Sequence, residues 1–343
     1  MTTTFASVDL DRVRTWMDER GLGEGPIEDV QQLGGGTQNI LLQFRRGERT
    51  YVLRRPPPHK RRNSDETMRR EARVLAALSG TDVPHPGFIA GHPDTDLIGA
   101  AFYLMEPVEG FNPTVEVPDA YLDDPSMGHG LGLAMADGIA ALGRLDPGEL
   151  GLADLGRPDG WLERQVARWR RQLDGYRELD GYEGAELPAV DETGAWLEAH
   201  RPETWRVGII HGDFTLTNVL ARRDRGELAA IVDWELSTQG DPLLDLGHLL
   251  ATWPEDDNTA QVAGDIHVPG LPTRDELVAR YARGSDRDLS NLPWYRVLAC
   301  YRLGLILEGT HARACAGLAP VEVGDRLHGM AVALLEQARK LTR

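Results

Sequence analysis

Apolar and polar residues alternate with a strand-like period over the first part of the chain. Two apolar runs, 40–44 and 51–53, flank a polar turn at Gly47, and this pattern predicts a β-hairpin. Helix-like and strand-like runs surround the hairpin: helices are expected at 7–21 and 64–78, and strands at 88–90 and 100–105. The first part of the chain is therefore expected to form a small, strand-rich lobe.

Helical spacing dominates the rest of the chain. The runs with a helical period are 127–145, 161–176, 191–200, 243–251, 274–283, 293–310 and 324–341. A short strand pair, 207–210 with 229–232, is expected to interrupt them. Because strands and helices are segregated, the predicted fold class is α+β, with an N-terminal lobe at 1–108 and a helical C-terminal lobe at 109–343.

Charge and composition limit the partners. The formal net charge is −17, and nearly all of the excess lies after residue 108. Nucleic acid and membranes are therefore not expected as partners. An acidic lobe could attract a cationic substrate, but an ordinary solvated surface is the favoured interpretation. Cys300 and Cys315 lie in one apolar run and are expected to be buried free thiols. With no leader-like N-terminus, a cytoplasmic location is expected.

The strongest chemical pattern follows the two short strands. His211, Asp213 and Asn218 come directly after the first, and Asp233 ends the second. A hairpin through residues 222–227 would bring these side chains together. Phosphoryl transfer uses such a set, because one carboxylate orients the attacking hydroxyl while an amide oxygen and a second carboxylate hold Mg²⁺.

With this H-x-D-x-x-x-x-N pattern and an aspartate about twenty residues later, the chain resembles the aminoglycoside phosphotransferase family of the protein-kinase-like superfamily. The resemblance implies a two-lobed kinase-like fold that uses ATP or GTP with Mg²⁺. It implies that Asp213 is the catalytic base and that Asn218 and Asp233 are metal ligands. It also implies that His211 braces the catalytic loop; the alternative is a metal ligand paired with Asp213.

A glycine-rich turn precedes the first hairpin strand. Gly34, Gly35, Gly36, Thr37 and Asn39 resemble the short phosphate-binding loop of this family, since glycines let backbone amides approach phosphate oxygens. An ordinary hairpin turn is the alternative.

The strand that follows departs from the family pattern, because an arginine stands where a lysine is expected. Lys60 and Lys340, the only lysines, lie outside this strand, so Arg54 is the candidate residue for binding the nucleotide phosphates. Arg55 points to the opposite face and is the weaker candidate. The Val-Leu-Arg-Arg-Pro-Pro run at 52–57 resembles kinase-like domains joined to some acyl-CoA dehydrogenases.

Other positions follow from the resemblance. Glu71 is the expected partner of Arg54, with a solvated helix residue as the alternative. Glu106 and Val108 mark the interlobe hinge, where backbone groups would bind the adenine. Asp241 is expected to cap its helix and brace the catalytic loop. Candidates for the acceptor pocket are Trp253, Arg302, Glu308 and His311, with ordinary helix surface or core as the alternative.

These observations predict a small-molecule kinase that moves the γ-phosphoryl of ATP or GTP to a hydroxyl. The acceptor is expected to be a metabolite, such as a hydroxyacyl thioester, or an aminoglycoside-like molecule. The missing strand lysine leaves open a nucleotide-binding module without catalysis. A metal hydrolase that uses His211 and Asp213 is a further alternative. The sequence sets no expectation for the oligomeric state.

Overall fold

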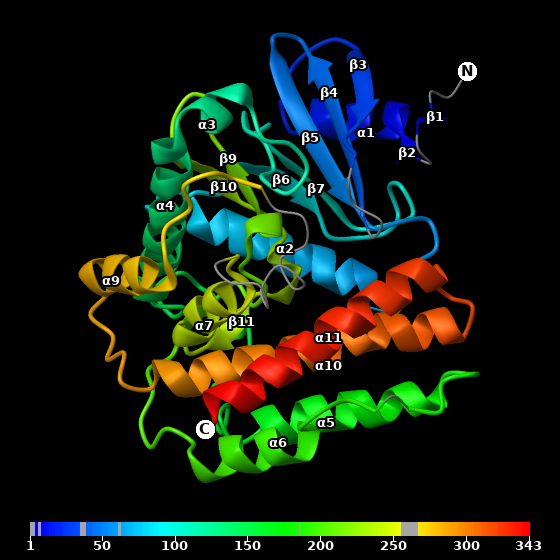
Figure 1. Cartoon of the computed structure of the whole chain (residues 1–343). Coiled ribbons are helices and arrows are strands. Elements are labelled where there is room, and N and C mark those ends of the chain that lie inside the picture. Colours follow the sequence, from blue (N-terminus) through cyan, green and yellow to red (C-terminus); the bar gives the residue numbers. More distant parts are fainter. Residues whose placement is uncertain (1–3, 6–7, 35–38, 61–62, 185, 255–266) are drawn as a thin grey trace.

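The computed structural model describes the chain except for residues 1–3, 6–7, 35–38, 61–62, 185 and 255–266. The described residues form two lobes (Figure 1). A five-stranded antiparallel sheet with the order β3-β4-β5-β7-β6 builds the N-terminal lobe. Its strands are Ile27–Gln32 (β3), Ile40–Arg46 (β4), Arg49–Arg55 (β5), Phe88–His92 (β6) and Phe102–Met105 (β7). The short strands Thr4–Phe5 (β1) and Val8–Asp9 (β2) pair separately.

Two helices cover opposite faces of this sheet. Leu53 belongs to the apolar cluster that includes Trp16 of α1 (Leu10–Asp18). The neighbouring Val52 belongs to the cluster that includes Leu75 of α2 (Ser64–Leu78). Because side chains alternate along a strand, Arg54 shares the face of Val52 and points toward α2.

The chain leaves the sheet after β7 and crosses to the second lobe. The Glu106 N–H donates to Gly87 O (2.7 Å), which holds the start of the crossing against the sheet. Phe111 and Ala221 exchange backbone hydrogen bonds of 2.9 and 2.8 Å, which attaches its end to the C-terminal lobe.

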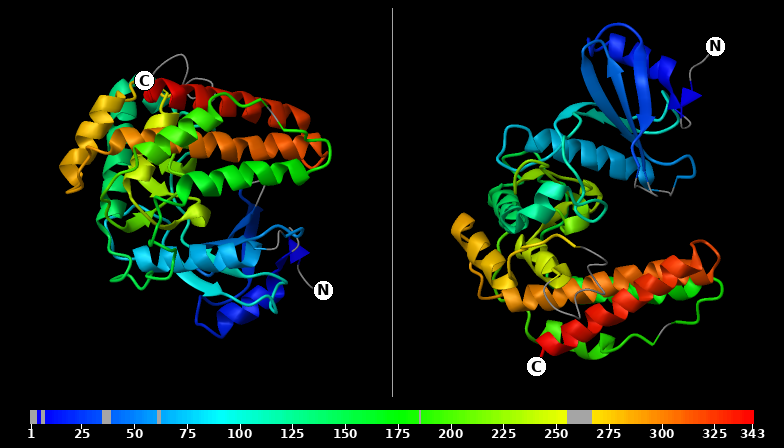
Figure 2. Two further views of the ribbon diagram at one scale, coloured as in Figure 1. Left: turned by 90° about the horizontal axis from the view of Figure 1, so that it is seen from below. Right: turned by 45° about the horizontal axis from the view of Figure 1, so that its top comes forward.

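The C-terminal lobe is mainly helical. In Figure 2, α5, α10 and α11 lie side by side on the part of this lobe that is remote from the sheet. Its helices are Asp119–Asp123 (α3), Pro125–Arg144 (α4), Gln165–Gly175 (α5), Val190–Ala199 (α6), Leu243–Thr252 (α7), Arg274–Gly284 (α9), Leu292–Cys315 (α10) and Val321–Leu341 (α11). None of the helices in the described part of the chain has the length and apolar character needed to cross a bilayer.

Two small antiparallel sheets sit in this lobe and correct the predicted strand pair. The strand Gly208–Ile210 (β8) pairs with Thr238–Gly240 (β11), whereas Val219–Ala221 (β9) pairs with Leu228–Ile231 (β10). The predicted pairing of 207–210 with 229–232 is therefore wrong. The partner of β8, Thr-Gln-Gly at 238–240, carries no apolar run that would predict a strand, whereas the partner of β10 is the apolar segment Val219–Ala221, joined to it by a short connection.

The two cysteines differ in exposure. Cys300 is a buried free thiol, as predicted, and burial raises its pKa to about 12. Cys315 is also free but exposed, so the prediction of burial is wrong there. It is the last residue of α10 and faces solvent, whereas the preceding Ala314 is buried.

Candidate active site

The loop between β8 and β9 carries the strongest sequence motif, and a buried aspartate holds it in place. Asp245, near the start of α7, accepts hydrogen bonds from the backbone N–H groups of His211 (2.7 Å) and Gly212 (2.9 Å). Gly212 has a φ of +84°, and a Cβ there would lie 2.6 Å from Leu236 O. The turn therefore requires glycine.

The bracing residue is not the one expected. Asp241 accepts hydrogen bonds from the Leu243 N–H (3.0 Å) and the Tyr295 hydroxyl (2.8 Å), so it organises the start of α7. Asp245 contacts the catalytic loop instead. The expectation that Asp241 braces this loop is wrong, because one further helical turn is needed to reach it.

Backbone groups engage both ring nitrogens of His211, which is buried. Nδ1 accepts the Asp213 N–H (3.3 Å), so the ring proton lies on Nε2 and is donated to Val232 O (3.0 Å). These contacts tie the catalytic loop to the end of β10. Because both ring nitrogens are engaged, His211 has none left to bind a metal ion. The alternative of a metal hydrolase that uses His211 and Asp213 therefore loses one of its two proposed ligands.

Asp213 is a partly exposed carboxylate of this loop, with 35% of its side chain accessible. Its Oδ2 and its backbone carbonyl accept hydrogen bonds of 2.9 and 2.8 Å from the Asn218 side-chain nitrogen. The Asn218 amide is thereby oriented with its nitrogen toward Asp213, which leaves the amide oxygen as the atom that a hard cation would take.

A chain of contacts behind Asp213 was not found from the sequence. Arg302 Nη1 lies 3.2 Å from His248 Nδ1, and His248 Nε2 lies 3.5 Å from Asp213 Oδ1. Because arginine has only donors, His248 Nδ1 accepts and its proton lies on Nε2, facing Asp213. Burial lowers the pKa of His248 to about 4, so it is neutral at neutral pH. The sequence did contain one indication of this contact: Asp245 and His248 are three residues apart, a spacing that places both on one face of α7.

Arg54 joins the two lobes at a charged cluster. Its Nε and Nη2 lie 3.0 Å from the two carboxylate oxygens of Glu71 on α2, and Nη2 also lies 2.9 Å from Asp233 Oδ1. Glu71 is 1% exposed. Burial raises the pKa of Glu71 to about 7, although the positive charge of Arg54 opposes this shift.

Asp233 follows β10 in a left-handed backbone conformation, with φ +66° and ψ +63°. Non-glycine residues rarely adopt this conformation, and aspartate does so more readily than most. Strained residues of this kind concentrate at functional sites. The side chain is 39% exposed, so it contacts Arg54 while part of it remains accessible to solvent.

The remaining nucleotide positions are less informative. Gly35, Gly36 and Thr37 lie outside the described residues, and Gly34 and Asn39 flank that gap ahead of β4. The Glu106 side chain lies at the surface and pairs with Arg49 Nη2 (2.8 Å). Val108 lies in the crossing between the lobes.

A cavity of about 190 Å³ opens beside the catalytic loop, lined in part by Gly212 and Ile210. Two arginines, Arg168 and Arg302, also line it, with their Cζ atoms 4.6 and 5.1 Å from the Trp169 ring centre. Among the described lining residues none is acidic. The cavity is therefore positively charged within an acidic lobe.

Of the four candidates for the acceptor pocket, only Arg302 lines this cavity. Trp253 is buried, and its indole N–H donates to Pro272 O (2.7 Å). Glu308 and His311 lie farther along α10, where they contact other groups. Arg168 was missed because a single arginine on a helix carries no distinguishing sequence signal.

The strand-rich and helical lobes define a kinase-like fold, and known proteins share it. The model of the phosphotransferase enzyme family matches residues 29–281, and the chain belongs to this family. A candidate aminoglycoside phosphotransferase from Ralstonia eutropha is 28% identical, with a TM-score of 0.79 over 97% of this chain and 99% of that one. The GDP complex of aminoglycoside 2'-phosphotransferase-IIIa, 17% identical, shares the fold with a TM-score of 0.60 over 96% of this chain and 98% of that one.

Acyl-CoA dehydrogenase family member 11 of Gallus gallus is 30% identical over 326 residues, which cover 92% of this chain and 40% of that protein. The chain therefore spans about two fifths of the length of this relative. The predicted two-lobed α+β fold, the family and the likeness to proteins named as acyl-CoA dehydrogenases are confirmed.

Proposed function

We propose that this protein transfers the γ-phosphoryl group of ATP or GTP to a hydroxyl of a small molecule. The observation that carries the proposal is the meeting of Arg54, Glu71 and Asp233 between the lobes, beside the catalytic loop with Asp213. An ion pair between a strand cation and a helix glutamate, facing an aspartate, is the arrangement kinases use to hold nucleotide phosphates and their metal.

The roles follow from position. Asp213 orients the acceptor hydroxyl and accepts its proton. Asn218 and Asp233 provide the oxygen atoms that would hold Mg²⁺, which neutralises phosphate charge when bound. Arg54 contacts the phosphates, and the glycine-rich sequence at 34–39 is proposed to contribute backbone amides to them. His211 and Asp245 keep the loop in shape through backbone hydrogen bonds.

The acceptor is proposed to be a hydroxyl-bearing metabolite with a negative group, such as a carboxylate or a phosphate; a hydroxyacyl thioester of coenzyme A qualifies through the phosphates of the coenzyme. The cavity beside Gly212 carries the charges of Arg168 and Arg302, and no acidic side chain lines its described part. A polycationic aminoglycoside would meet repulsion there. The likeness to acyl-CoA dehydrogenase family member 11 points toward the same type of acceptor.

A thermal-shift titration with ATP and GTP, each with and without Mg²⁺, tests the nucleotide site. Stabilisation should require Mg²⁺, reach about 2.7 kcal/mol at 100 times Kd, and disappear in Asp233→Ala. The exposed Asp154, paired with Arg73 (2.5 Å), provides the matched control Asp154→Ala, which should keep the shift. If neither nucleotide stabilises the wild type, the proposal is wrong.

An acceptor screen tests catalysis and the charge of the acceptor. Hydroxycarboxylates and hydroxyacyl thioesters should be phosphorylated in preference to kanamycin-type aminoglycosides. Arg168→Met should raise KM for the anionic acceptor, whereas Arg171→Met, on the same helix but outside the cavity lining, should not. Nucleotide binding without turnover on any acceptor would favour the non-catalytic module, and preference for aminoglycosides would refute the charge argument.

A further inference from the structure

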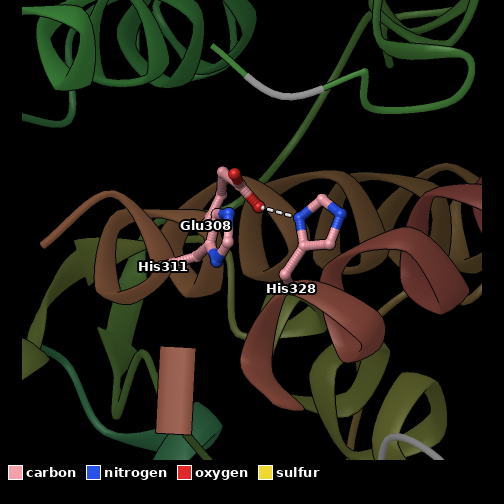
Figure 3. A group of neighbouring side chains, drawn as sticks. All are labelled: Glu308, His311 and His328. Atoms are coloured by element: carbon pink, nitrogen blue, oxygen red, sulfur yellow. Dashed lines mark hydrogen bonds and ion pairs between the residues drawn. The ribbon is translucent and has the colours of Figure 1, made fainter. Parts of the chain in front are cut away.

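A second cluster of metal-binding side chains lies on the C-terminal hairpin of α10 and α11, away from the catalytic loop. Glu308 and His311 come from α10 and His328 comes from α11 (Figure 3). One potential ligand atom of each lies within 4.8 Å of the others. In Figure 3 the Glu308 and His328 side chains point toward each other across the two helices.

Helical spacing and close packing bring the three side chains together. Glu308 and His311 are three residues apart and share one face of α10. Gly324 allows α11 to approach this face, because a Cβ there would lie 2.4 Å from the Ala314 side chain and 3.3 Å from His311 Cα. His328 lies one turn farther along α11 and therefore faces the same place.

Glu308 is a buried carboxylate whose hydrogen-bond partners in the described part of the chain, Tyr182 and His328, carry no permanent positive charge. It is 0% exposed. The Tyr182 hydroxyl donates to Oε1 (2.8 Å), and His328 Nδ1 lies 2.7 Å from Oε2. Because a buried carboxylate is costly without a compensating charge, a cation at this position would stabilise it. Tyr182 holds the carboxylate in the way that supporting residues orient metal ligands.

His311 has a buried ring nitrogen that is available as a metal ligand. Its Nδ1 is buried and has no hydrogen-bond partner among the described residues; the nearest acidic atom is Asp325 Oδ1, at 3.5 Å. Its Nε2 lies 3.7 Å from Cys315 Sγ. The side chains of His311 and His328 are 20% and 30% exposed, so an ion could enter from solvent between them.

We propose that Glu308, His311 and His328 bind a divalent transition-metal ion, with zinc as the best match. Two imidazoles and one carboxylate suit Zn²⁺, whereas Mg²⁺ and Ca²⁺ prefer oxygen ligands throughout. The bound ion ties α11 to α10. The site is separate from the catalytic loop: Arg302, which contacts His248 behind Asp213, lies roughly 9 Å from Glu308 along α10, at about 1.5 Å per residue.

Titration of the EDTA-treated full chain with ZnCl₂ and with CoCl₂ tests the proposal. Calorimetry should show one saturable ion per chain, and Co²⁺ should give visible absorption bands of low-symmetry nitrogen and oxygen coordination. His311→Ala and His328→Asn should each weaken binding by more than about 10-fold, since ligands matter at least as much as the residues that support them. A Mg²⁺-dependent nucleotide shift that equals the wild-type shift establishes that each variant is folded.

Two control variants separate this site from other sources of binding. His200→Ala removes an exposed histidine on another helix end and should leave affinity unchanged. Cys315→Ser should also retain binding, because the thiol is not among the proposed ligands. Absence of saturable binding overturns the proposal. So does unchanged affinity in both cluster-histidine variants, or loss of binding in Cys315→Ser, which would assign the ion to the thiol.

Discussion

Replacing Arg54 with methionine removes the guanidinium that neutralises the buried Glu71. The side chain of Glu71 is 1% exposed, and both of its oxygens lie 3.0 Å from Arg54 nitrogens. Breaking a buried ion pair from one side costs about 3–5 kcal/mol of folding free energy, because the remaining charge has lost its partner. Glu71→Gln should cost less, about 1–3 kcal/mol, since Arg54 keeps its contact with Asp233.

The double variant Arg54→Met/Glu71→Gln leaves neither charge of the pair behind. It should therefore be more stable than Arg54→Met alone, with a coupling free energy of about 2–3 kcal/mol between the two sites. The binding of Mg²⁺-nucleotide should nevertheless stay lost, because Arg54 is absent in both variants. This combination separates the structural contribution of the pair from its proposed role at the phosphates.

The penalty should also depend on pH, with a defined sign. Burial raises the folded-state pKa of Glu71 from 4.5 to about 7, so the folded protein holds a proton that the unfolded chain releases. The associated stability is present below pH 4.5 and is lost as the pH rises through 7. Removing Arg54 raises this pKa further. Arg54→Met should therefore reduce the free energy of unfolding only slightly at pH 5.5, where Glu71 is protonated, and by the full amount of about 3–5 kcal/mol at pH 8.5, where it is charged.

Urea unfolding followed by circular dichroism at these two pH values measures the effect. Arg55→Met is the matched control, because Arg55 is also buried but donates to the carbonyls of Pro56 (2.9 Å) and Ile98 (3.3 Å). The loss of unfolding free energy caused by Arg55→Met should be the same in the wild-type and the Glu71→Gln background. If the penalties of Arg54→Met and Glu71→Gln simply add, to within about 0.5 kcal/mol, the two residues are not coupled and the reasoning fails.

Three further predictions concern the catalytic loop. Asp213→Asn should reduce kcat by about 10²–10⁴-fold without weakening the Mg²⁺-nucleotide thermal shift, and a steady-state assay that finds unchanged kcat removes Asp213 from the role of base. His248 is held neutral with a pKa of about 4, below its unfolded value of 6.5, so its own contribution to stability should fall by about 3 kcal/mol between pH 6.5 and 4. Urea titrations of wild type and His248→Asn over that range measure this contribution as the difference between the two proteins, in which the opposite contribution of Glu71 cancels. Gly212→Ala places a Cβ 2.6 Å from Leu236 O at a φ of +84°, so it should reduce the free energy of unfolding by about 1–3 kcal/mol and abolish most turnover. Gly175→Ala is the control, because the space around its Cβ position is open; it should melt within a degree or two of wild type.

Local patterns predicted much of the fold because they depend on near neighbours. The helix 64–78 was predicted with the bounds that α2 has, and the hairpin at 40–53 lies within β4 and β5. Alternation along β5 also predicted which face Arg54 occupies, and α2 brings Glu71 to that face. Period and alternation are set by backbone geometry, so a sequence reports them directly.

Contacts between distant segments were not accessible in the same way. The pairing of 207–210 with 229–232 was wrong, because strand partners depend on how several segments fold back together. The brace is Asp245, inside α7, and not Asp241, just before it, because only the orientation of α7 decides which carboxylate reaches the loop. His248 went unnoticed since its neighbours, Arg302 and Asp213, are far from it in sequence.

The sequence by itself determined the order of the lobes, the phosphotransferase motif and the departure from lysine to Arg54, since these depend on residue type and spacing along the chain. Tertiary structure alone decided the positive charge of the cavity beside the catalytic loop and the meeting of Glu308, His311 and His328 on two helices. Both arise from side chains that share no local pattern. They become neighbours only when helices pack, because packing brings together residues that the chain itself keeps apart.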